Sequence, residues 1–170
     1  GLSGGVPIAT IVSDPPKVNL DIIKKLAENN PTIPDFHYYL ACSLLSHGKI
    51  NEFVVTAKNY LFMERNPKSI IQITLIRYYL AIVLMSRDLG ESLKLAIACL
   101  AANSLMAEFW CLVGDIYFKL RNYSHSIHFY ENAMILGSKR LSNDGWPMEI
   151  SKYKEYPTEK MNLINSNQVH

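Results

Sequence analysis

The chain has 170 residues, of which 49% are hydrophobic and 19% charged, which is enough for one domain with a substantial core. Its net charge of +2 gives no bulk attraction for nucleic acid, so we expect no nucleic-acid partner. No apolar run reaches the roughly 18 residues needed to cross a bilayer, and no secretory signal is visible. We therefore expect no membrane partner and a cytoplasmic location.

The three cysteines favour the same compartment. Cys42, Cys99 and Cys111 are odd in number, match no zinc spacing and lie in apolar helical contexts. We expect small buried thiols in a reducing compartment.

The N-terminal part of the chain should be an arm followed by a helix. Residues 1–18 are rich in Gly and Pro and predict an extended arm. A helix is expected from Asn19 to Asn29, because Asn19 is a suitable N-cap, Asp21 suits the first turn, and Pro15-Pro16 block extension backwards.

Three antiparallel helix pairs should follow, because apolar residues recur at helical spacing and short turns interrupt them. The expected pairs are residues 36–60 with a turn at Gly48-Lys49, Ile70 to about Ala102 with a turn at residues 87–90, and residues 110–133 with a turn at residues 120–123.

The third pair carries a recognisable pattern. It reads Trp110-x3-Gly114-x2-Tyr117-x5-Tyr123-x2-Ser126-x3-Tyr130-x2-Ala133. This spacing resembles a tetratricopeptide (TPR) repeat, which is a helix, a tight turn and a second antiparallel helix. Ser126 stands where the family usually has Ala. The earlier pairs repeat the layout more weakly, with Ala41, Leu80 and Gly114 matched at spacings of 39 and 34 residues against a family period of about 34.

The resemblance implies an all-α fold. We expect a short right-handed TPR-like solenoid of about three repeats over residues 19–138, with the preceding helix as part of it. An irregular C-terminal tail with a short helix would follow over residues 139–170. Small residues should lie where helices approach closely, and large ones should fill the gaps. The predicted repeat-packing residues are Ala41, Ala57, Ala96, Trp110, Gly114, Tyr117, Tyr123, Tyr130 and Ala133.

The resemblance also implies a binding groove, because the inner face of a TPR array comes mostly from the first helix of each repeat. Only Arg77 and Lys119 resemble the cationic clamp with which some TPR proteins hold chaperone C-termini. An apolar or helical peptide, or the protein's own tail, fits the groove better. Alternatively, residues such as Met85 and Phe118 simply fill core space. The predicted groove residues are Asp35, Tyr38, Arg77, Met85, Glu108, Asp115, Phe118 and Lys119.

The tail is too apolar to be solvated. A turn is expected at residues 144–147 and a short helix from Pro157. The residues expected to pack onto the last repeat or into the groove are Trp146, Pro147, Met148, Ile150, Tyr153 and Tyr156. The segment 144–157 is also similar to segments that follow TPR repeats in some bacterial and phage glycosyltransferases, which would imply an appendage of such an enzyme.

No catalytic constellation is visible. The chain has no glycine-rich phosphate loop, nucleophile elbow or paired-carboxylate motif, so we expect neither an enzyme nor a cofactor. His125, His128 and Glu131 share a helix face at metal-ligand spacing, but a solvated outer face is the favoured interpretation and no metal is expected.

A non-catalytic scaffold that binds a protein or peptide partner through the groove is the leading hypothesis. The alternatives are an appendage of a multidomain glycosyltransferase and a structural subunit that forms homo-oligomers through its repeat ends. The start at Gly1 rather than Met suggests a processed or tag-cleaved product, or a piece of something longer.

Overall fold

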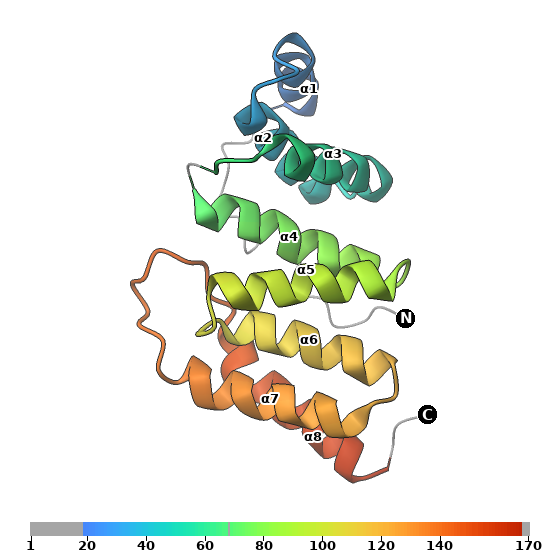
Figure 1. Cartoon of the computed structure of the whole chain (residues 1–170), viewed down its shortest axis with the longest axis vertical. Coiled ribbons are helices and arrows are strands. Elements are labelled where there is room, and N and C mark those ends of the chain that lie inside the picture. The colour runs from blue at the N-terminus through green and yellow to red at the C-terminus, as the bar shows by residue number, and fades with distance from the viewer. Residues whose placement is uncertain (1–18, 68, 168–170) are drawn as a thin grey trace. The chain divides into compact units, whose positions relative to one another are not determined.

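The computed structural model describes residues 19–67 and 69–167, so the arm expected over residues 1–18 lies outside the described residues. The described part is all-helical and contains eight α-helices, a 3-10 helix and no strand, as predicted (Figure 1). Between Ile76 and Arg77 the chain divides into two compact units. None of the helices in the described part is both long and apolar enough to span a bilayer.

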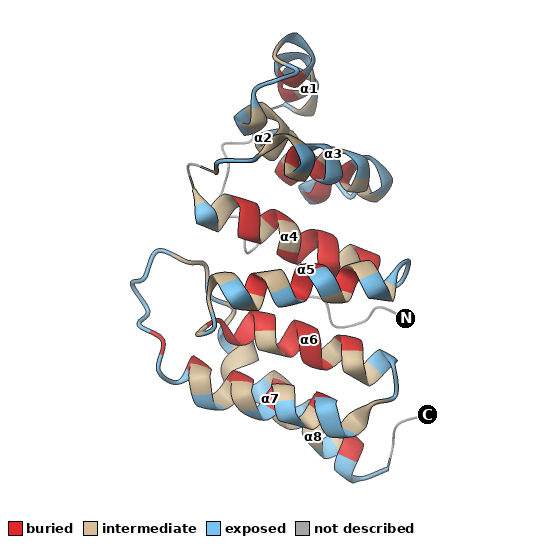
Figure 2. Ribbon diagram, viewed as in Figure 1, coloured by how far each residue is buried: buried red, intermediate tan, exposed pale blue. Residues whose placement is uncertain are grey.

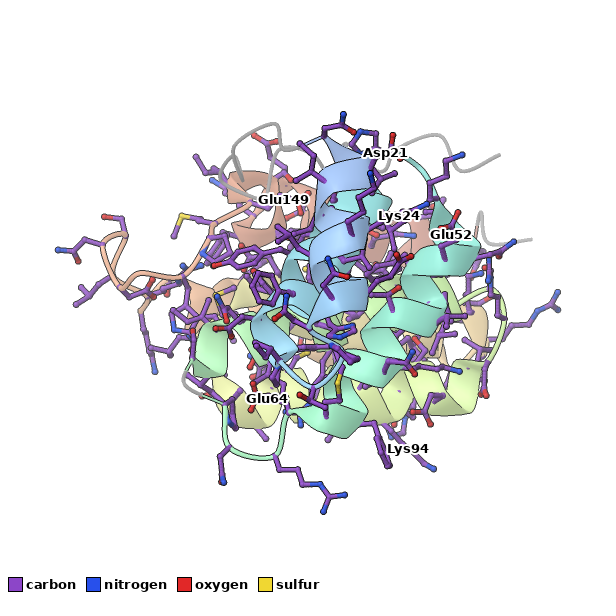
Figure 3. The ribbon with its side chains drawn as sticks, turned by 90° about the horizontal axis from the view of Figure 1, so that it is seen from above. Asp21, Lys24, Glu52, Glu64, Lys94 and Glu149 are labelled. Atoms are coloured by element: carbon purple, nitrogen blue, oxygen red, sulfur yellow. The ribbon has the colours of Figure 1, made fainter. Side chains whose placement is uncertain are left out.

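The first unit contains three helices and the beginning of a fourth. The Asn19 side chain accepts a hydrogen bond from the Asp21 N–H at 2.9 Å and caps the first helix, as predicted. Lys24 Nζ lies 3.1 Å from Glu52 Oε2 and ties the first helix to the third, and both side chains are labelled in Figure 3. The elements are α1 (Leu20–Asn29), α2 (Pro34–Ser46), α3 (Ile50–Met63) and the start of α4 (Ile70–Leu84).

The α2–α3 hairpin has a closely packed interior. Ala41, Phe53 and Ala57 have no exposed surface, and Tyr60 is 1% exposed. The chain reverses at Gly48, whose φ of 70° suits a residue without a Cβ atom.

The second unit contains the rest of α4, the three helices that follow it, and the tail. Its elements are α5 (Leu89–Ala102), α6 (Ala107–Lys119), α7 (Tyr123–Gly137), η2 (Ile150–Tyr153) and α8 (Glu155–Asn165). In Figure 2 much of α6 is buried, whereas buried and exposed residues alternate along α5 and α7. This alternation is what a helix with one face on the core requires.

Helices α6 and α7 pack closely at Gly114. A Cβ atom there would lie 2.7 Å from Tyr130 Cε1, so only glycine fits without displacing that ring. Ala96 and Ala133 are also fully buried, whereas Trp110, Tyr117 and Tyr123 are half-buried. Trp110 and Tyr117 both pack on the Phe129 ring.

The hairpin of α4 and α5 differs from the sequence-based alignment by one residue. Ser126 Oγ donates to the Gly114 carbonyl at 2.8 Å, and Ser92 Oγ donates to the Ala81 carbonyl at 2.6 Å. Ala81 therefore corresponds to Gly114, and the predicted match of Leu80 is wrong. The stretch between the two bonded residues is one residue shorter, since it spans 11 residues in this hairpin and 12 in the next, although four residues separate α4 from α5 and three separate α6 from α7.

The same hairpin turns earlier than expected. The predicted turn at residues 87–90 included Leu89 and Gly90, but both lie in α5. The reason is that the Asp88 side chain accepts from the Glu91 N–H at 3.0 Å and starts the helix at Leu89.

Candidate functional site

The predicted groove residues fall into three groups. In the first unit, Asp35 is exposed and Tyr38 is half-buried against the Tyr39 and Tyr60 rings. In the second unit, Arg77 and Met85 are half-buried and Lys119 is exposed.

The structure brings Glu108, Asp115 and Phe118 together on one face of α6, as their spacing along the helix requires. Cys111 lies between the two acids on the same face. All four residues contact the C-terminal tail, and we call this face with its tail contacts the α6 groove.

Glu108 is the most buried acid of the groove, at 3% exposed. Its Oε1 accepts the backbone N–H of Glu149 at 2.7 Å, and its Oε2 accepts the Tyr153 hydroxyl at 2.7 Å. Arg140 Nη1 lies 3.7 Å from Oε1. Burial raises the pKa of Glu108, and the bonds from Glu149 and Tyr153 only partly offset that effect.

Asp115 lies two helical turns further along α6. Its Oδ1 accepts the Tyr130 hydroxyl at 2.5 Å, and its Oδ2 accepts the Tyr156 hydroxyl at 2.8 Å. Burial raises the pKa of Asp115 as well, against the lowering effect of the two hydroxyls and of Lys152. Both carboxylates therefore use both oxygens as acceptors of tyrosine hydroxyls or backbone N–H.

Two lysines of the tail lie over aromatic rings at the same face. Lys160 Nζ is 4.3 Å from the centre of the Phe118 ring, and Lys152 Nζ is 3.3 Å from the centre of the Tyr156 ring. Between the two acids, the Cys111 thiol donates to the Lys152 carbonyl at 3.4 Å. The groove thus combines a buried acceptor, Glu108, and a half-buried one, Asp115, with the Phe118 ring as a surface for a cation.

Arg140 anchors the beginning of the tail and was not found by sequence reasoning. Its Nε and Nη2 atoms lie 2.7 Å and 2.9 Å from the Asp144 carboxylate. Nη2 also donates to the Trp146 carbonyl at 2.7 Å, and Nη1 donates to Tyr153 Oη. Burial opposes the guanidinium charge, but these partners raise the pKa of Arg140, and Arg140 in turn lowers the pKa of Asp144. The only local signal was the four-residue spacing of Arg140 and Asp144.

Gly137 makes room for the tail. A Cβ atom there would lie 2.8 Å from Tyr153 Cδ1 and 3.1 Å from Ala107 Cβ. The absence of a side chain at the end of α7 therefore admits the Tyr153 ring.

The apolar residues of the tail behave differently from one another. Tyr153 and Tyr156 pack against a core cluster of Ala107, Cys111, Tyr130, Ala133 and Ile164. Trp146 is half-buried and meets the Phe109 ring edge-on at 6.3 Å. The expectation of packing is wrong for Met148 and Ile150, which are 38% and 79% exposed.

The terminal helix is longer than the sequence suggested. It begins at Glu155, two residues before the predicted start at Pro157, and continues to Asn165. Pro157 fits because the first turn of a helix needs no N–H at that position. Ile164 of this helix packs in the core cluster with residues of α6 and α7.

The histidines of α7 make local contacts. His125 Nδ1 lies 2.9 Å from Asn122 Oδ1, and its ring stacks on Tyr117. His128 meets Phe129 edge-on and contacts Asn132. Among the residues that the structure describes, no three His, Cys, Asp or Glu side chains gather closely enough to hold a metal ion.

Comparison with known proteins gives a fold. No family model matches the sequence. No curated protein matches it either. Among solved structures, a fragment of MamA from residue 41 to the end, from Desulfovibrio magneticus RS-1, superposes with a TM-score of 0.66 at 17% identity, over 87% of this chain and 74% of that one. The chain has a TPR-like helical-repeat fold.

Two further structures agree. A crystal structure of MamA matches with a TM-score of 0.62 at 13% identity, over 88% of this chain and 86% of that one. A double mutant, MamA RS-1 ArsTM, gives 0.61 at 18% identity, over 89% of this chain and 86% of that one. At these identities the likeness shows the TPR-like fold and does not carry over a partner. The similarity of the tail to glycosyltransferase segments stays a prediction.

Proposed function

We propose that this protein is a non-catalytic scaffold that binds a polypeptide segment of a partner protein in the α6 groove. The observation that carries the proposal is that the groove already holds a polypeptide segment. The tail is bound there through its backbone at Glu149 and Lys152 and through the hydroxyls of Tyr153 and Tyr156.

The TPR-like fold supports this role. A helical hairpin cannot bury its apolar faces alone, so repeats stack and leave an inner face that suits extended or helical segments. The chemistry of the groove agrees. Glu108 and Asp115 present hydrogen-bond acceptors, and in the structure each of them accepts a tyrosine hydroxyl of the bound tail. The thiols of Cys42, Cys99 and Cys111 are buried, which suits a reducing compartment, and we propose the cytoplasm as the location of the protein.

Site-specific photo-crosslinking in the native cells tests the proposal. A photoreactive residue replaces Lys119, which is exposed at the end of α6 beside the groove, and in a control it replaces Glu131, which is exposed on α7. We expect a defined protein to crosslink from position 119 and not from position 131. If crosslinking is the same from both positions, the groove is not the binding surface.

A further inference from the structure

We infer that the α6 groove recognises a segment of the form Lys-Tyr-x-x-Tyr-x-x-x-Lys in a partner protein, and that the tail segment Lys152–Lys160 is an internal competitor for that partner. The inference rests on the proposed function and names the partner's chemistry.

The two tyrosine hydroxyls provide the selectivity. Tyr153 donates to Glu108 at 2.7 Å, and Tyr156 donates to Asp115 at 2.8 Å. A phenylalanine at either place would leave a buried carboxylate oxygen without its donor, which costs more than the bond itself contributes. A site built around hydroxyl donors discriminates strongly against a ligand that lacks them.

The two lysines match the charge of the groove. Lys160 lies over the Phe118 ring, and Lys152 lies over the Tyr156 ring of the tail itself. Both ammonium groups also act on Asp115, whose pKa they lower against the effect of burial. A partner segment needs the same cations to offset the charge of Asp115.

Some tail positions contribute no side-chain selectivity. Glu149 and Lys152 reach Glu108 and Cys111 through backbone atoms, which any residue supplies. Ile150 is 79% exposed although it lies in the middle of the bound segment. The segment is therefore read at its tyrosines and lysines.

Two features favour exchange of the tail. Residues 141–145, which connect the tail to α7, are all exposed, as the blue loop in Figure 2 shows. The buried acids of the groove are also more costly than apolar residues would be in a permanent cap. Polar contacts of this type are typical of interfaces whose partners come and go.

A nicked form of the full chain separates the tail from the groove covalently. Residues 141–143 are replaced by a recognition sequence for a specific protease, which spares Asp144 and its bonds to Arg140. After cleavage, a fluorescent peptide of residues 144–167 is titrated in, and its anisotropy reports binding. Before cleavage the attached tail competes at an effective concentration in the millimolar range, so we expect binding at least about tenfold weaker than after cleavage.

Peptide variants test the recognition rule. Replacing both Tyr153→Phe and Tyr156→Phe should weaken binding to the nicked chain on the order of 100-fold or more. Ile150→Ser is the matched control and should bind like the parent peptide. A nicked chain carrying Gly137→Ala should bind none of the peptides well, because the new Cβ atom takes the place of the Tyr153 ring.

Three results would overturn the inference. One is a nicked chain that stays folded by circular dichroism and never exchanges its tail, since the tail is then a fixed cap. Another is equal affinity for the parent and the double phenylalanine peptide. A third is energy transfer between differently labelled intact chains that swap tails, which would assign the groove to a second copy.

The experiments distinguish failure of this inference from failure of the proposed scaffold role. A crosslinked partner whose bound segment lacks the tyrosine pair would contradict this inference and leave the scaffold role in place. Peptide exchange with no partner crosslinked from position 119 would contradict the scaffold role, because the groove would then serve the tail alone.

Discussion

Substituting Gly137 by alanine should weaken tail docking by a predictable amount. The new Cβ atom would lie 2.8 Å and 3.1 Å from two carbons of the Tyr153 ring, so the ring must move by several tenths of an ångström. The Tyr153 hydroxyl would then lose its alignment with Glu108, a bond to a charged group worth about 1.5–3 kcal/mol. Alanine gains about 0.5–1 kcal/mol over glycine within a helix. The net expectation is a loss of about 1–2 kcal/mol in the free energy of unfolding.

Urea unfolding followed by tryptophan fluorescence measures this loss. Both tryptophans of the chain, Trp110 and Trp146, belong to the second unit, so the signal reports the unit that Gly137 affects. We expect the midpoint to fall by about 0.5–1 M urea.

The matched control is Gly90→Ala, observed by circular dichroism. Gly90 lies in the first turn of α5, and the atom nearest to its added Cβ would be 3.6 Å away, an ordinary contact. This variant should be unchanged or slightly more stable. If Gly137→Ala were as stable as Gly90→Ala, the close packing of Tyr153 on α7 would not exist and the reasoning would fail.

Three further predictions concern buried polar groups. Ser126→Ala should cost about 1 kcal/mol of unfolding free energy, measured in urea, because its hydroxyl is fully buried on a backbone carbonyl. The thiols of Cys42 and Cys99 should react with an aromatic disulfide at pH 8 only after denaturant is added, because burial raises their pKa values to about 11 and about 12. Stability should fall as pH rises above the ordinary pKa values of the Glu108 and Asp115 carboxyl groups, because their pKa values are raised by burial and the folded state therefore binds protons more tightly than the unfolded state.

Each has its own control. Ser124→Ala removes an exposed hydroxyl two residues away and should change stability little. Fast labelling without denaturant would contradict the thiol prediction.

The sign of the pH effect follows from the raised pKa values of Glu108 and Asp115. The stability that they contribute is present below their ordinary pKa values and is lost as pH rises through the raised pKa values. Asp144 acts oppositely, but only below its ordinary value of 3.8, since Arg140 lowers its pKa. A rise in urea midpoint from pH 5 to pH 8 would contradict the assignment, and Asp115→Asn should flatten the slope.

The helices of the repeats were predictable because their signals are local. Asn19 as an N-cap and Gly48 at a turn are read within a few residues of sequence. The residue of the second hairpin that corresponds to Gly114 was not predictable, because Leu80 and Ala81 are both apolar and buried, and composition cannot choose between them. That choice depends on backbone bonds that form only once the two helices pair.

The groove residues on α6 were predictable as a face, but their partners were not. Glu108 is 45 residues from Tyr153, and Asp115 is 41 residues from Tyr156, so no periodic pattern links them. The exposure of Ile150 shows the same limit. Hydrophobicity predicted that the tail would dock, whereas only the geometry shows which of its residues face α6.

The two acids of α6 connect the fold with the proposed function. Glu108 and Asp115 lie where an apolar residue would give a more stable repeat, since a buried carboxylate carries a large desolvation cost. That cost is offset only while donors such as the hydroxyls of Tyr153 and Tyr156 remain in place. The groove must therefore be filled, either by the tail or by a segment with the same donors, and the energy that holds the tail is the energy a partner has to match.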